Sequence, residues 1–75
     1  MIIYRDWDHN SNVRAFELGP DSITVQFKDG ATYLYTSLTP GRLEVAHMAK
    51  LAQAGNGLNG YIATVIKKRY AQKIA

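Results

Sequence analysis

Three short segments, each rich in β-branched and aromatic residues, follow one another between residues 13 and 36. They are residues 13–18 (VRAFEL), 22–28 (SITVQFK) and 31–36 (ATYLYT). The sequences GPD and DG between them are typical of turns, so we predict a three-stranded antiparallel meander. In the middle segment Ile23, Val25 and Phe27 alternate with polar residues, a pattern that predicts a sheet with one buried face.

The turn at Asp29-Gly30 decides which face of this sheet carries Tyr33 and Tyr35. A two-residue type I′ loop would place Gln26 opposite Tyr33 and put both tyrosines on the polar face. A three-residue loop, closed by a left-handed glycine and a bulge, would place Val25 opposite Tyr33 and turn both tyrosines towards the core.

We favour the three-residue loop because it buries more apolar area. Burying two tyrosine rings outweighs burying Leu34 by on the order of 2 kcal/mol, provided that each hydroxyl finds a partner or reaches the rim. The choice matters for function, since an exposed pair of aromatic rings on a sheet is what single-stranded RNA modules use to stack bases.

Two helices are predicted after the meander, to cover the buried face of the sheet. The Thr39 hydroxyl at the cap and Pro40 at the first helical position indicate a helix over residues 40–54, which ends at the sequence GNG. A second helix follows, because apolar residues recur at helical spacing on one face: Leu58, Tyr61, Ile62, Val65, Ile66 and Tyr70.

The 75 residues suit one domain, because a chain of this length hides only about 60% of its unfolded surface and has little to divide between two cores. Residues 1–10 are expected to form an extra edge strand or an arm. The predicted fold class is therefore α+β, with an antiparallel meander of three to four strands followed by two helices packed on one face.

The net charge of +3 is unevenly distributed along the chain. Residues 1–44 carry four basic side chains and all six acids, a net charge of −2, whereas residues 45–75 carry five basic side chains and no acid, a net charge of +5. A basic half of this kind is typical of proteins that bind polyanions, although lysine and arginine can also simply solvate a helix. The candidate nucleic-acid-binding residues are Lys50, Lys67, Lys68, Arg69 and Lys73.

Other polar clusters give weaker signals. Asp6, Asp8 and His9 in DWDHN lack the further ligands that a metal site needs, so we interpret them as a polar turn. His47 is expected to be half-buried and to serve packing. The sequence GNG before a helix could seat a phosphate, but it matches no nucleotide-binding motif. We predict no catalytic residues, metal or cofactor, and hence no enzyme.

The chain resembles the KTSC domain, a short bacterial module found at the C-terminus of some lysyl-tRNA synthetases and as a stand-alone protein. The resemblance covers roughly residues 11–70 and rests on Ser11-Asn12, on ITVQFKDG followed by YLY at residues 33–35, on LTP, and on the spacing of Gly55, Asn59 and Ile62. It departs from the family pattern at Gln53 and in the position of KKRY. The resemblance implies RNA binding. Apart from it, the hydroxyls of Tyr33 and Tyr35 could meet a ligand at the rim of the core, and Asn59 is a further candidate contact.

The sequence thus predicts a small non-enzymatic binding module whose partner is RNA or another nucleic acid. The alternative is a protein-interaction or self-associating accessory module, of phage or prophage type, that uses an apolar patch or an edge strand. The absence of cysteine suits a reducing cytosol. The start of the chain does not resemble a signal peptide and no segment resembles a membrane span, so we expect a cytoplasmic protein without a membrane partner.

Overall fold

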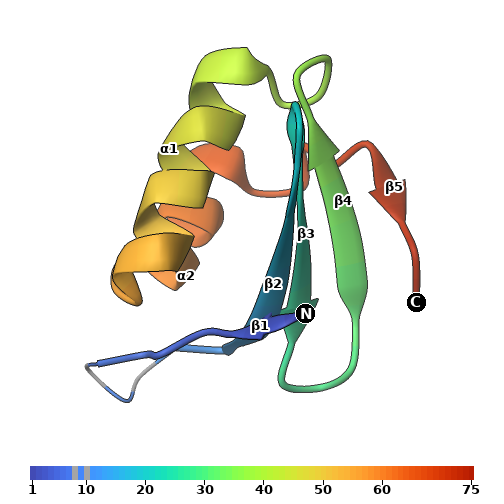
Figure 1. Cartoon of the computed structure of the whole chain (residues 1–75). Coiled ribbons are helices and arrows are strands. Elements are labelled where there is room, and N and C mark those ends of the chain that lie inside the picture. Colours follow the sequence, from blue (N-terminus) through green and yellow to red (C-terminus); the bar gives the residue numbers. More distant parts are fainter. Residues whose placement is uncertain (8, 10) are drawn as a thin grey trace.

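The computed structural model describes residues 1–7, 9 and 11–75, and within them it forms an antiparallel sheet covered by helices (Figure 1). The strands lie in the sheet in chain order, each antiparallel to the next: β1 (Ile2–Ile3), β2 (Val13–Gly19), β3 (Ser22–Phe27), β4 (Thr32–Thr36) and β5 (Gln72–Lys73). The α-helices α1 (Arg42–Ala54) and α2 (Leu58–Tyr61), continued by the π-helix η1 (Ile62–Ile66), cover one face. The predicted α+β class and the meander of β2, β3 and β4 are confirmed.

The turn between β3 and β4 is the three-residue loop that the sequence favoured. The Phe27 N–H donates to the Ala31 carbonyl at 2.8 Å, and the Gly30 N–H donates to the Phe27 carbonyl at 2.9 Å. Gly30 has a φ of 94°, which only glycine adopts easily. Val25 therefore lies opposite Tyr33, which confirms the predicted register.

The core lies between the sheet and the helices. Tyr35 is 1% exposed and Tyr33 is partly buried, so both tyrosines face the core side of the sheet as expected. The buried hydrophobic cluster draws on the strands, on both helical segments and on the residue after β1: Tyr4, Val13, Phe16, Ile23, Val25, Tyr35, Val45, Met48, Ala52, Leu58, Ile62 and Ile66. Thr32 is buried as well, because the end of the chain covers it through backbone hydrogen bonds with Ile74 and Ala75.

The first helix begins later than the sequence predicted. It starts at Arg42, with Gly41 at the cap and no side-chain capping bond, so the prediction that Thr39 caps it was wrong. Thr36 holds the turn that precedes the helix. Its Oγ1 accepts hydrogen bonds from the N–H groups of Leu38 and Thr39, and its carbonyl accepts from the Gly41 N–H. This local turn delays the helix by two residues.

The end of α1 agrees with the sequence, but the end of the second helical segment does not. Gly55 closes α1 with a φ of 75° and donates its N–H to the Leu51 and Ala52 carbonyls. The second segment was expected to run through Tyr70 along one apolar stripe, but η1 ends at Ile66, and Lys67 has a φ of 56°. The chain then crosses to the free edge of β4 and forms β5, a strand that the sequence analysis missed.

The first residues of the chain form the expected edge strand and continue into a docked segment. Ile2 pairs with Phe16 and Ile3 pairs with Ala15. Tyr4 is 4% exposed, and its hydroxyl accepts a hydrogen bond from the Leu58 N–H at 3.1 Å. Further along, the Trp7 N–H donates to the Gly55 carbonyl and Trp7 Nε1 donates to the Ala54 carbonyl, both at 3.0 Å. The segment therefore ties β1 to the junction of α1 and α2.

Replacing Tyr4 by phenylalanine is expected to lower the free energy of unfolding by about 1–3 kcal/mol, because the buried Leu58 N–H then loses its acceptor. Urea unfolding followed by circular dichroism measures this change. Tyr61→Phe is the matched control, since no hydrogen bond of the Tyr61 hydroxyl is described and its ring lies against His47. Equal stability of Tyr4→Phe and the wild type would show that this hydrogen bond does not hold the N-terminal segment in place.

Candidate nucleic-acid interface

Three aromatic rings meet at the rim of the core, on the side where β4 pairs with β5. The Tyr33 ring lies 5.8 Å from Phe27, edge to face at 74°, and 4.6 Å from Tyr70 at 45°. All three residues are partly buried, whereas the neighbouring Tyr35 is closed off from solvent. We call Phe27, Tyr33 and Tyr70 the aromatic cluster. Its members pack against the core and still reach the surface, where a flat ligand could stack.

The chain after η1 brings Tyr70 and Lys73 to Tyr33. The positive φ of Lys67 turns the backbone out of the helix, and the Ala71 N–H then donates to the Leu34 carbonyl at 2.7 Å. In β5, Lys73 pairs with Tyr33, and Lys73 Nζ lies 5.9 Å from the centroid of the Tyr33 ring. This is within the range of a cation–π contact. Aromatic and basic groups therefore meet at the edge that β5 closes.

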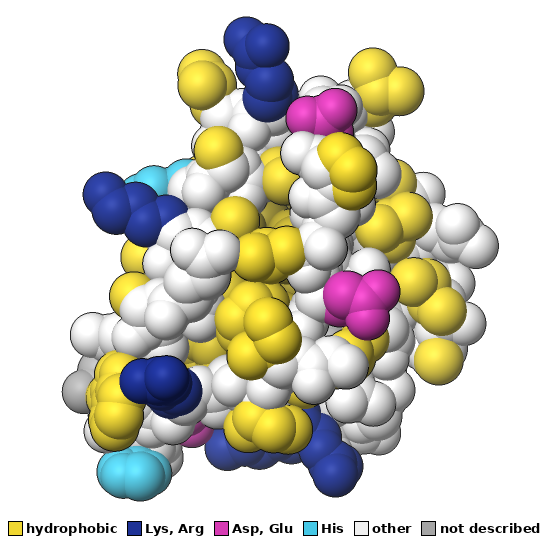
Figure 2. Space-filling view, viewed as in Figure 1, with side chains coloured by type: hydrophobic (Ala, Val, Ile, Leu, Met, Phe, Trp, Pro, Cys, Tyr) yellow, Lys and Arg dark blue, Asp and Glu magenta, His cyan; other side chains and the backbone are white. Residues whose placement is uncertain are grey.

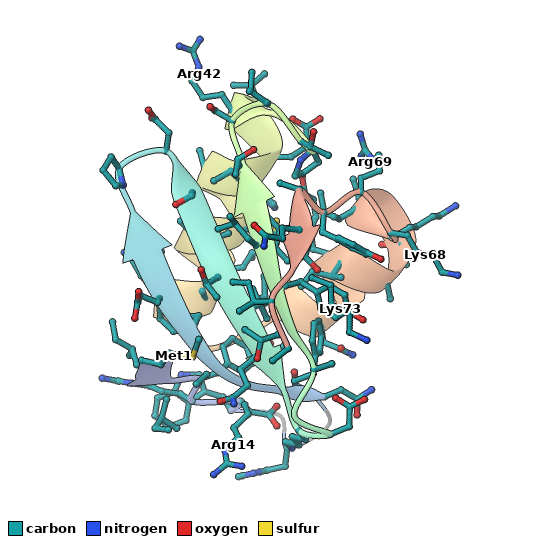
Figure 3. The ribbon with its side chains drawn as sticks, turned by 90° about the vertical axis from the view of Figure 1, so that its right-hand side faces the viewer. Met1, Arg14, Arg42, Lys68, Arg69 and Lys73 are labelled. Atoms are coloured by element: carbon teal, nitrogen blue, oxygen red, sulfur yellow. The ribbon has the colours of Figure 1, made fainter. Side chains whose placement is uncertain are left out.

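The remaining basic residues of this segment are exposed at the same side of the molecule. Lys67, Lys68 and Arg69 follow η1 directly, and all three are exposed. Figure 3 shows Lys68 and Arg69 extending from the side of the molecule where Lys73 lies on β5, with Arg14 at the bottom of the view. The Arg69 guanidinium donates to the Val65 carbonyl at 3.0 Å, which places it over the last turn of η1. We call Lys67, Lys68, Arg69 and Lys73 the basic segment.

Lys50 lies on a different element from the other predicted binding residues. Lys50 is exposed on α1, and no hydrogen bond or ring contact described for the chain joins it to the basic segment. The second helix was predicted to run through Tyr70 and so to include KKRY. This prediction was wrong, because η1 ends at Ile66, before these residues. Tyr70 therefore contacts Tyr33 from outside the helix.

Two of the three expected rim contacts lie elsewhere. Tyr35 is too deeply buried to meet a ligand, so only Tyr33 reaches the rim of the aromatic cluster. Asn59 lies on α2 and lines a separate polar hollow of about 250 Å³ together with Tyr4, Ser11 and Gly57. Ser11 and Asn59 thus line the same hollow, which does not include Tyr33.

A second hollow adjoins the aromatic cluster at the β3–β4 loop, and the sequence analysis did not predict it. It has a volume of about 620 Å³ and is lined by Asn12, Phe27, Lys28, Asp29, Ala31 and Tyr33. Phe27 and Tyr70 were missed as site residues because they read as ordinary apolar positions of a strand and a helix. Only their pairing with Tyr33 in space reveals them.

The other polar groups weighed in the sequence show no converging chemistry. Asp6 pairs with Lys28 at 3.4 Å and accepts from the Ser11 N–H, while Asp8 lies outside the described residues. His47 is exposed, so the expectation that it is half-buried was wrong; its ring lies 4.5 Å from Tyr61. The Leu58 N–H after GNG is already bonded to Tyr4. In the part of the chain that is described, no group of three His, Cys, Asp or Glu residues could hold a metal.

No family model, curated protein or solved structure matches this chain. Among the described residues, no helix is both long and apolar enough to cross a bilayer.

The burial of Tyr35 predicts that the protein loses stability at alkaline pH. Burial first, and then the nearby Tyr33 and Tyr70, raise the pKa of Tyr35 from its ordinary value of 10.0 to about 12. The stability that Tyr35 contributes is therefore complete below about pH 10 and falls as the pH rises towards about 12, by up to about 1.4 kcal/mol per unit of pKa difference. Urea unfolding at about pH 8 and about pH 11 measures this loss.

Tyr35→Phe is the control for this alkaline titration, because phenylalanine cannot ionise and should remove the part of the loss that belongs to Tyr35. Ultraviolet absorbance of tyrosinate gives an independent reading, because Tyr35→Phe should remove a component that titrates near pH 12. Equal alkaline losses in the wild type and Tyr35→Phe would contradict the prediction.

Proposed function

We propose that this protein is a small non-enzymatic module that binds nucleic acid, RNA foremost, through the basic segment and the aromatic cluster. One observation carries the proposal: the residues after η1 return to β4 and bring Tyr70 and Lys73 onto Tyr33. Cations that attract phosphate thereby adjoin rings that can stack a base. Modules that bind single strands combine these same two elements.

The charge of the basic segment supports a polyanionic ligand. In the described residues the one ion pair joins Lys28 to Asp6, so none of Lys67, Lys68, Arg69 and Lys73 is paired with a described acid. All acids of the sequence lie before residue 45. Phosphates can therefore supply the missing counter-charges without competing with an internal salt bridge. The resemblance to the KTSC domain points to the same class of ligand.

The triple substitution of Lys67, Lys68 and Arg69 by glutamine is expected to weaken binding to all sequences alike. Four phosphate contacts give the wild type a slope of log K against log salt of roughly −3 to −4, and removing three of them should flatten it by about 2 to 3. Fluorescence anisotropy with labelled single- and double-stranded RNA and DNA, over a series of salt concentrations, measures both quantities.

The matched control for this variant is the triple substitution of Arg5, Arg14 and Arg42 by glutamine, which lowers the net charge equally at exposed residues outside the basic segment. It should change the slope by less than about 1. The double variant of Lys67 and Lys68 keeps the Arg69 bond to Val65, in case its loss affects folding. Absence of binding even at low salt, or equal losses in the two triple variants, would overturn the proposal.

A second candidate function, self-association, is favoured by the other edge of the sheet. Ile2 and Ile3 on β1 are 56% and 67% exposed, and the edge carries no charged side chain within this strand. Figure 2 shows hydrophobic side chains gathered between α1 and β2, near this edge. Open apolar edge strands are sites of pairing with another chain.

Self-association through β1 predicts that Ile3→Lys converts a dimer into a monomer, because a lysine on an edge strand opposes pairing. Light scattering at high protein concentration gives the mass of the wild type and of the variant. Leu38→Lys, at an exposed residue in the turn before α1, is the control for added charge. A wild-type protein that is monomeric at high concentration would exclude this candidate and leave the nucleic-acid proposal untouched.

A further inference from the structure

The hollow at the β3–β4 loop has the walls of a site for a planar ring. Phe27 and Tyr33 both line it, and their rings pack edge to face, 5.8 Å apart. Its volume of about 620 Å³ falls within the range of small-ligand sites, about 300–1,000 Å³. Figure 1 shows the loop at the end of the sheet away from the start of α1, with the loop on the outside of the fold.

The opening of the hollow carries groups that can hydrogen-bond the edge of a base. Asn12 supplies an exposed carboxamide, and its backbone carbonyl accepts from the Lys28 N–H at 2.7 Å, which fixes the two residues side by side. Asp29 Oδ1 accepts from the Ala31 N–H at 2.9 Å, so the loop that frames the hollow is itself held by hydrogen bonds. These groups offer both donors and acceptors around an aromatic floor.

Two lysines lie at the residues that line the hollow: Lys28 lines it, and Lys73 contacts its wall residue Tyr33. The Lys28 side chain is 55% exposed despite its contact with Asp6. Lys73 Nζ lies over the Tyr33 ring and leads to the remainder of the basic segment. A strand that places a base against Phe27 and Tyr33 would therefore have Lys28 and Lys73 within reach of its phosphates.

We propose that this hollow receives one unpaired base of a single-stranded nucleic acid; this inference rests on the proposed nucleic-acid binding and specifies its ligand. In a duplex the bases are stacked and paired, so none can enter the hollow without being extruded. A single strand exposes its bases at no such cost. The protein should therefore prefer single strands to duplexes of the same length, and the preference should depend on the hollow and not on the basic segment.

Ala31→Leu tests the inference, because Ala31 lines the hollow and a larger apolar side chain fills it without changing any charge. Loss of one stacked base is expected to lower the affinity for a labelled single-stranded RNA by about 5- to 100-fold, with the salt slope unchanged. Ala46→Leu, the same change at an exposed position of α1, should leave the affinity within about twofold, as surface substitutions normally do. Circular dichroism and urea unfolding show whether each variant is folded.

Nuclear magnetic resonance locates the base directly and remains decisive if Ala31→Leu does not fold. Titration of the wild type with adenosine, guanosine, cytidine and uridine 5′-monophosphates should shift the Asn12 side-chain amide and the Gly30 and Ala31 backbone amides. Inorganic phosphate at the same concentration should not shift them. Salt-dependent RNA binding without these shifts, or with equal affinity for duplex and single strand, would overturn the base site and leave the proposed function standing; absence of any binding would overturn both.

Discussion

The unpaired edge of β4 is the constraint on which the arrangement of this protein depends. The meander leaves one row of β4 backbone groups without a partner, and such a row must be bonded to water, to another chain or to a later part of the same chain. Here the C-terminal residues bond to it: the Ala71 N–H donates to the Leu34 carbonyl and the Ile74 N–H donates to the Thr32 carbonyl, both at 2.7 Å. The helical segment ends at Ile66, and the residues after it are therefore free to pair with this edge.

This strand addition also assembles the candidate interface. Tyr70 reaches Tyr33 only because the chain has left the helix, and Lys73 lies over the same ring because it pairs with Tyr33 in β5. An aromatic pair contributes about 0.5–1.5 kcal/mol beyond its area, and an exposed cation–π contact about 0.5–1 kcal/mol. These gains are modest, yet they act together with the backbone hydrogen bonds of β5. The stability of the edge and the composition of the site therefore have a common origin.

The sequence predicted the parts of the fold that depend on neighbours in the chain. The register of Tyr33 against Val25 followed from the apolar area that a three-residue loop buries, and Gly55 marked the end of α1. The end of the second helical segment could not be found in this way, since Tyr70 continues the helical spacing of Leu58, Ile62 and Ile66. Its partner is Tyr33, which lies far away in the sequence, and contacts of that kind override a local pattern.

The candidate site was predictable in its charges but not in its shape. The acid-free half of the sequence identified the basic segment, whereas it also included Lys50, which lies on α1. The hollow depends on Asn12 lying beside Lys28, a contact made across β2 and β3 near the bulge between Val13 and Ala15. Bulges re-aim the residues around them without a marked sequence signal. A list of polar residues could therefore not indicate that Asn12 and Phe27 share one opening.

The path of the chain after Ile66 is the central claim, and nuclear magnetic resonance of the free protein tests it most directly. The structure predicts nuclear Overhauser effects between the rings of Tyr33 and Tyr70, an upfield shift of the Lys73 side chain, and slow amide exchange at Ala71 and Ile74. Helical Cα shifts and sequential amide contacts that run unbroken from Leu58 to Tyr70, with rapid exchange after Tyr70, would contradict it. That result would support the sequence prediction of a helix that runs through Tyr70. It would also remove the aromatic cluster on which the proposed interface rests.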